Sequence, residues 1–150
     1  MSSFTEDLVL KWLPELKKFR VYLSFDYHIG SEDSDEVINI PEGYLTDLAS
    51  IPPIARWLIP KLGRHAQAAT LHDYIYEYNK YSRKKCDKIF LEAMKVLKVP
   101  FWKRQVMHKA VRMFGWISWN NRRYSEHTKM AKKKTKRVED NSHQKNTWRH

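Results

Sequence analysis

Residues 68–76 read AATLHDYIY and residues 82–90 read SRKKCDKIF, and these two stretches decide the fold. Both have the apolar spacing of amphipathic helices, and the polar residues 79–81 between them form a short connection. We therefore expect the two helices to pair as an antiparallel hairpin. His72 lies seven residues before this connection and Asp87 lies six after it, so the two side chains should lie at nearly equal depth and meet.

His72 belongs to the inward face of the first predicted helix, because its neighbours one turn away are apolar. These neighbours are Ala68, Ala69, Ile75 and Tyr76. Asp73, about 100° further round, should point toward the rim. A histidine oriented by one carboxylate and flanked by another has the groups of a general base and of a hard-cation ligand. Alternatively, His72 is a hydrogen-bonded core residue and Arg83 forms a helix ion pair with Asp87.

Four blocks of the sequence resemble, in the same order, a small uncharacterised family encoded by bacteriophages and prophages. The blocks are PEGYLTDLASIP at 41–52, LHDYIY at 71–76, RKKCDKIF at 83–90 and AVRMFG at 110–115. The resemblance covers roughly residues 19–117. It implies a phage-encoded accessory protein that works in the host bacterial cytoplasm or is packaged in the phage particle, and it implies no particular activity.

A second, local resemblance concerns chemistry. The sequence HDYIY at 72–76, followed by Cys86 and Asp87 on an antiparallel helix, is similar to the catalytic helices of phospholipase A-two enzymes. The resemblance implies that His72 activates water, that Asp73 binds calcium, and that Tyr76 and Asp87 brace the histidine. The sequence departs from that family by lacking its glycine-rich calcium loop and its disulfides. Asp47 would have to supply the missing calcium ligands.

The fold predicted from the pattern is α+β, a small antiparallel sheet followed by three to four helices. Apolar and polar residues alternate over 19–27, which predicts a half-buried strand, and shorter strands are expected at 37–40 and 44–46. The acidic run 31–36 is expected to be a hairpin turn. Residues 1–120 are long enough for one globular domain with its own core, in which the single cysteine, Cys86, is a packing residue.

Asp47 follows the predicted sheet and has two interpretations. It is either a third carboxylate of the same site or the cap of a brief helical turn that runs through Ser50. Ser50 and Arg83 are the remaining candidate site residues. The next segment, 53–62, is expected to form a short amphipathic helix that packs on the core or covers a substrate.

The C-terminal residues 121–150 carry ten lysines and arginines against three acidic residues, out of a formal charge of +11 for the whole chain. We expect a flexible basic arm that binds nucleic acid or anionic lipid, or that only aids solubility. The candidate polyanion-binding residues are Lys132, Lys133, Lys134, Lys136 and Arg137. The sequence has no run of 18 or more apolar residues, so no transmembrane helix is predicted.

Three functions remain open from the sequence. The first is a hydrolase of phospholipase A-two-like or related metal-assisted type that acts on an ester or a phosphodiester, with a divalent cation, calcium in the first place. The second is a non-enzymatic phage virion or host-interaction protein, indicated by the many aromatic residues near 115–119, which exceed what one helical face can bury. The third is a nucleic-acid-binding protein that works through the basic arm.

Overall fold

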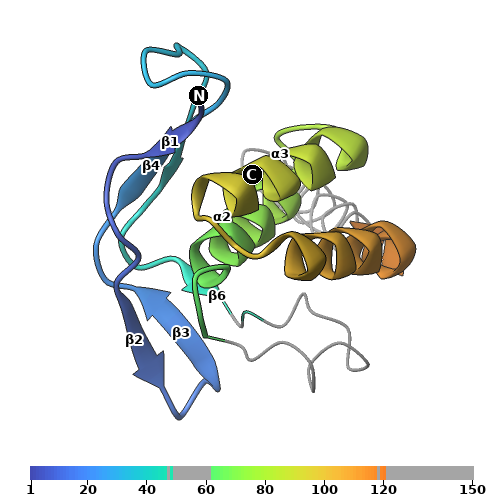
Figure 1. The fold of residues 1–150 in the computed structure, drawn as a ribbon. Helices are drawn as coiled ribbons and strands as arrows, with labels where there is room; N and C mark the ends of the chain where they lie inside the picture. Colours follow the sequence, from blue (N-terminus) through green and yellow to red (C-terminus); the bar gives the residue numbers. More distant parts are fainter. Residues whose placement is uncertain (47, 49–61, 118, 121–150) are drawn as a thin grey trace, which may run out of the picture. The chain divides into compact units, whose positions relative to one another are not determined.

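The computed structural model describes residues 1–46, 48, 62–117, 119 and 120 (Figure 1). The chain divides into two compact units, Met1–Trp116 and Ile117–His150. In the second unit the described residues 117, 119 and 120 are helical. Everything below concerns the first unit. The predicted helix at 53–62 lies outside the described residues.

The first unit begins with two antiparallel sheets of three strands each, followed by helices, which confirms the predicted α+β class. One sheet has the order β1-β4-β5 and the other has the order β2-β3-β6. The strands are β1 (Ser3–Phe4), β2 (Leu10–Leu13), β3 (Lys18–Val21), β4 (Phe25–His28), β5 (Val37–Ile40) and β6 (Leu45–Thr46).

The alternating stretch 19–27 was predicted as one strand, but it forms parts of two. Residues 22–24 are exposed and separate β3, which pairs with β2 and β6, from β4, which pairs with β1 and β5. The side-chain alternation continues through both strands, so the pattern alone does not mark the break. The acidic run 31–36 does connect β4 to β5 as a hairpin, in which His28 lies opposite Val37.

The predicted helical hairpin is confirmed as α2 (Ala66–Glu77) and α3 (Arg83–Val96), which pack against each other. The chain turns between them through Asn79, whose φ of 48° is one that asparagine tolerates better than most residues. Ser82 then caps α3, because its hydroxyl accepts a hydrogen bond from the backbone N–H of Lys85 at 3.3 Å. Local sequence signals therefore account for this hairpin.

Within the first unit, residues 101–116 form a third helix. Its buried side packs into the core through Met107, Ala110 and Val111. The expected excess of apolar surface near its end is confirmed, since Trp116 is 54% exposed and Met113 is 64% exposed. No helix among the described residues is long and apolar enough to cross a membrane.

The core joins the helical hairpin to the first sheet. Residues with almost no exposed surface come from α2, α3 and the strands β4 and β5. They include Phe25, Tyr27, Ile38, Ile40, Leu71, Ile75, Phe90 and Met94. Cys86 is fully buried among them, as predicted for a packing residue.

Candidate functional site

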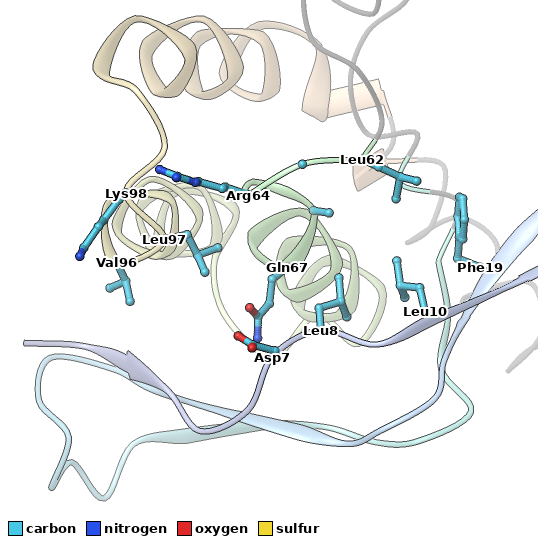
Figure 2. Close-up of a pocket in the computed structure, with 12 residues that line it drawn as sticks. Asp7, Leu8, Leu10, Phe19, Leu62, Arg64, Gln67, Val96, Leu97 and Lys98 are labelled. Carbon is cyan, nitrogen blue, oxygen red and sulfur yellow. The ribbon is translucent and has the colours of Figure 1, made fainter.

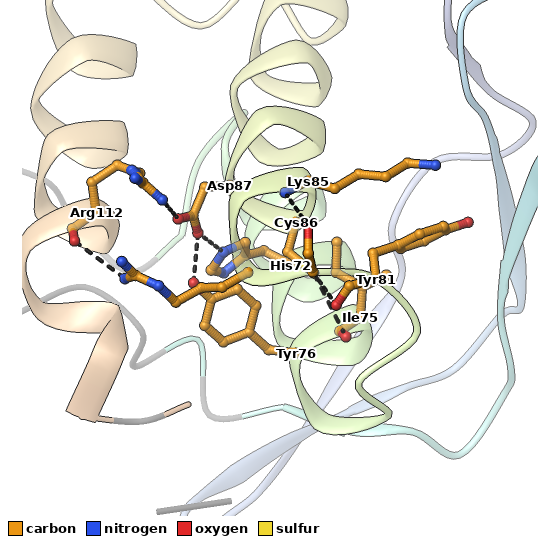
Figure 3. Close-up of polar contacts among 10 residues, drawn as sticks. His72, Ile75, Tyr76, Tyr81, Lys85, Cys86, Asp87 and Arg112 are labelled. Atoms are coloured by element: carbon orange, nitrogen blue, oxygen red, sulfur yellow. Dashed lines mark hydrogen bonds and ion pairs between the residues drawn. The ribbon is translucent and has the colours of Figure 1, made fainter. Parts of the chain in front are cut away.

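The carboxylate of Asp87 is the centre of a buried polar cluster (Figure 3). One oxygen, Oδ1, lies 3.1 Å from Nε2 of His72 and accepts a 2.5 Å hydrogen bond from the hydroxyl of Tyr76. The other oxygen, Oδ2, accepts a hydrogen bond from Nη1 of Arg112 at 3.0 Å. Three side chains thus converge on one carboxylate, which is 0% exposed.

These side chains come from three helices. His72 and Tyr76 lie four residues apart and therefore on one face of α2. Asp87 reaches them from the first half of α3, so the expectation of equal depth in the hairpin is met. Arg112 comes from helix 101–116, and its side chain is 39% exposed. The cluster is consequently a junction of all three helices.

Aromatic rings hold the imidazole of His72. The ring centre of Tyr76 lies 4.1 Å from the imidazole centre, and that of Phe90 lies 4.7 Å from it. Arg112 and Tyr76 both donate to the carboxylate of Asp87 and favour its ionised form. Nε2 of His72 is then the ring nitrogen that donates a proton to Asp87.

The electrostatics of the cluster follow from burial and hydrogen bonding. Burial alone would raise the pKa of Asp87, but the hydrogen bonds from His72, Tyr76 and Arg112 outweigh it and lower the pKa below its usual value. Burial, together with the bond to this carboxylate, raises the pKa of the Tyr76 phenol. Asp87 is therefore ionised at neutral pH, and the phenol of Tyr76 keeps its proton and donates it in a hydrogen bond to Asp87.

A second histidine, His108, lies one turn before Arg112 on helix 101–116. Burial lowers its pKa, the charge of Asp87 opposes this change, and Arg112 and His72 reinforce it. His108 thus shares the electrostatic environment of the cluster. No local sequence pattern indicates a role for His108 or Arg112. The one available sign was that Arg112 belongs to the last of the four family-like blocks.

Arg83 does not form the helix ion pair with Asp87 that the alternative interpretation expected, as far as the described residues show. Its Nη1 instead donates to the backbone carbonyl of Arg112 at 3.2 Å. Gly115 allows this close approach, since a β-carbon there would lie 3.0 Å from the hydroxyl of Tyr76 and 3.7 Å from Nη1 of Arg83. Arg83 thus ties α3 to helix 101–116 rather than neutralising Asp87.

Asp73 is buried rather than turned to the rim, with 3% of its surface exposed. The reason is that β6 packs against α2 on this side. The hydroxyl of Thr46 in β6 donates to Oδ2 of Asp73 at 2.8 Å, and it also accepts a hydrogen bond from the backbone N–H of Leu48 at 3.1 Å. Asp73 therefore links the helical hairpin to the second sheet.

The other predicted site residues lie outside the described part of the chain. These residues are Asp47, Ser50, Lys132, Lys133, Lys134, Lys136 and Arg137. In the part that the structure describes, no three histidine, cysteine, aspartate or glutamate side chains gather as they would around a metal ion.

A hollow of about 640 Å³ lies between the N-terminal strands and the ends of α2 and α3 (Figure 2). Its apolar walls include Leu10, Phe19 and Leu97, and Arg64 and Lys98 also line it. None of the predicted site residues lines it. The hollow and the Asp87 cluster are therefore separate features of the first unit.

Comparison with known proteins relates the chain to one family. The sequence model of the family described as "Protein of unknown function (DUF1353)" matches residues 19–111. No curated protein and no solved structure matches the chain. The matched residues include α2, α3, all members of the Asp87 cluster except Arg112, and four of the six strands in whole or in part. Because the match spans more than half of the sequence, the chain belongs to the DUF1353 family.

Proposed function

We propose that this protein is a hydrolase in which His72 activates a water molecule. The observation that carries the proposal is the contact of 3.1 Å between Nε2 of His72 and Oδ1 of Asp87. A neutral imidazole that donates from Nε2 has its basic Nδ1 available for a proton from water. Asp87 would orient the ring and stabilise the imidazolium that forms.

Tyr76 and Arg112 have supporting roles in this proposal. Both donate to Asp87, and they hold its carboxylate in one orientation through separate oxygens. An oriented base is more effective than a mobile one, because the geometry of proton transfer is set before the substrate arrives. His72, Tyr76 and Asp87 are also the residues that carry the resemblance to the helices of phospholipase A-two enzymes. The choice of an ester substrate rests on that resemblance. Phosphodiesters are the second substrate class.

A divalent cation, calcium in the first place, is a separate part of the proposal. Asp73 and Asp47 are its candidate ligands. The carboxylate of Asp73 is buried and bound to Thr46, and the described residues around it do not complete a donor set. No step of the proposed reaction is therefore assigned to the metal, and His72 and Asp87 carry the chemistry.

A second candidate function rests on the burial of the same cluster. His72 is 2% exposed, and Asp87 is fully paired by three donors, as expected of a polar joint that holds helices together. Helix 101–116 also has exposed aromatic residues, among them Trp102, which is 50% exposed. Such residues favour an interaction role. We propose as the alternative a phage-encoded virion or host-interaction protein without catalytic activity.

The deciding experiment assays the purified full chain on panels of carboxylic esters and phosphodiesters, with and without calcium. The hydrolase proposal expects His72→Gln to lower the rate by about 10²-fold or more while the thermal melt still shows a cooperative transition. Tyr78→Phe is the matched control, because Tyr78 is 58% exposed on the same helix hairpin. Absence of activity on both panels would favour the interaction role. Hydrolysis that survives His72→Gln would overturn the assignment of His72 as the base.

Metal binding is tested separately by thermal melts with calcium, magnesium, manganese and zinc. A ligand that binds the folded state raises the melting temperature by mass action. The cation part of the proposal expects an increase with one metal that is lost in Asp73→Asn. Equal melting temperatures with every metal would remove the cation and leave the His72 chemistry to be judged by the activity assay.

A further inference from the structure

The hairpin of β2 and β3 carries a row of cations on one face. Residues 14–17 connect the two strands, and the antiparallel register places Lys11 opposite Arg20 and Leu13 opposite Lys18. Because side chains alternate between the faces of a strand, Lys11, Lys18 and Arg20 point to the same side. All three are exposed.

The opposite face of the hairpin turns toward the helices. Leu10 and Phe19 lie there and line the hollow beside α2, as Figure 2 shows. Their alternation with Lys11 and Arg20 leaves the cationic face directed away from that hollow. The two faces therefore differ in character: one is apolar, and the other carries the three cations together with the buried Leu13.

The cationic face is unfavourable for the hairpin itself. Lys11 and Arg20 are directly opposite each other, and like charges in that arrangement destabilise a strand pair. No ion pair in the described part of the chain neutralises Lys11, Lys18 or Arg20. A partner that supplies negative charge would relieve this repulsion.

Lys17, in the turn, extends the row to the tip of the hairpin. Its φ is 51°, a left-handed conformation that favours glycine or asparagine over lysine. The backbone therefore gives no reason for lysine at this position, whereas a function of its charge does. Between Leu10 and Val21 the chain holds four cationic residues and a single acidic one, Glu15.

We propose that the outer face of the β2–β3 hairpin binds the phosphate backbone of a nucleic acid through Lys11, Lys17, Lys18 and Arg20. Residues on one face of a strand repeat every ~6.8 Å, about twice the ~3.4 Å axial spacing of phosphates on one strand of DNA. The contacts are to phosphates, so binding is independent of base sequence.

The distribution of aromatic residues favours nucleic acid over a membrane. Trp12 is 46% exposed, but it pairs with Phe19 on the face opposite the cations, with ring centres 4.8 Å apart. Surfaces that dock on anionic bilayers combine basic residues with aromatic residues directed into the lipid. The outer face of the hairpin has the charges without such aromatic residues.

The test measures binding of the full chain to a short DNA duplex of mixed sequence between about 50 and 200 mM salt. The variant is Lys11→Gln, Lys17→Gln, Lys18→Gln and Arg20→Gln combined. The matched control removes four exposed lysines elsewhere, namely Lys84, Lys88, Lys95 and Lys109. The basic C-terminal residues are present in every protein, so their contribution is common to all.

The expected result is a shallower salt dependence for the hairpin variant. The slope of log affinity against log salt should lose about 0.9 per phosphate contact, up to about 3.6, while the control keeps most of the original slope. Replacing Lys11, Lys17 and Lys18 by arginine should preserve binding, because charge is what the phosphate recognises. Equal slopes for the hairpin variant and the control would overturn the proposal. The proposal would also be overturned if the chain bound vesicles with anionic lipid but not the duplex, and if the hairpin variant lost this vesicle binding.

This inference is independent of the proposed hydrolase. None of the four hairpin cations contacts His72 or Asp87 through a hydrogen bond or ion pair in the described structure. His72→Gln should therefore bind the duplex as the unmodified chain does. Failure of one proposal leaves the other unaffected.

Discussion

The hydroxyl of Tyr76 and the imidazole of His72 contact the same oxygen of Asp87, at 2.5 Å and 3.1 Å. The two residues lie one helical turn apart on α2, so a single carboxylate from α3 spans both of them. Whatever reaction the protein performs, this arrangement makes the position of His72 depend on Tyr76 and Asp87. The predictions below separate the contributions of these residues.

Tyr76→Phe removes one donor to Asp87 and leaves the aromatic contact with His72. A hydrogen bond to a charged group contributes about 1.5–3 kcal/mol, and we expect the free energy of unfolding to fall by that amount. Tyr78→Phe, at a residue that is 58% exposed, should change it by less than about 0.5 kcal/mol. Chemical denaturation of the two variants measures both values. Equal effects would mean that the buried hydroxyl contributes nothing.

Asp87→Asn should change how stability depends on pH. The pKa of Asp87 is lowered in the folded chain, so the stabilisation it provides is complete above the unfolded value of about 3.9 and is lost as the pH falls through the lower folded value. The difference in melting temperature between the unmodified chain and Asp87→Asn should therefore be large near neutral pH and shrink in acid. A difference that stays constant down to strongly acidic pH would contradict this account.

Gly115→Ala should destabilise the protein, although alanine is more favourable than glycine inside a helix by about 1 kcal/mol. The new β-carbon would lie 3.0 Å from the hydroxyl of Tyr76, which cannot withdraw because Asp87 binds it. The clash is with this hydroxyl, so the same substitution in a Tyr76→Phe background should be neutral or stabilising. A double-mutant cycle measured by denaturation gives the coupling between the two positions. Additive effects would show that Gly115 is not needed for this approach.

Cys86 should resist alkylation in the folded protein. Burial raises the pKa of its thiol to about 12, and the side chain is 0% exposed, so little thiolate is present or accessible at neutral pH. Labelling with iodoacetamide should become fast only when denaturant unfolds the chain, with the same midpoint as the spectroscopic transition. Rapid labelling without denaturant would show that the α2–α3 hairpin opens locally.

The sequence alone determined the helical hairpin and the pairing of His72 with Asp87. The signals were local: an inward apolar face around His72 and a short polar connection at 79–81. Nearly equal distances from the turn, seven and six residues, then placed the two side chains at similar depth, because helices advance by the same rise per residue. The strand at 37–40 and the buried Cys86 followed from similar local patterns.

Only the tertiary structure decided which further groups reach the site. Arg112 lies 25 residues after Asp87, and its contact depends on how helix 101–116 packs, which no local pattern encodes. Asp73 is buried because β6 packs over it, although its helical angle alone pointed to the rim. The stretch 19–27 likewise divides between two sheets, since the choice of strand partners is a property of the whole chain. Local sequence specifies the periodicity of an element, whereas long-range packing specifies what each of its faces meets.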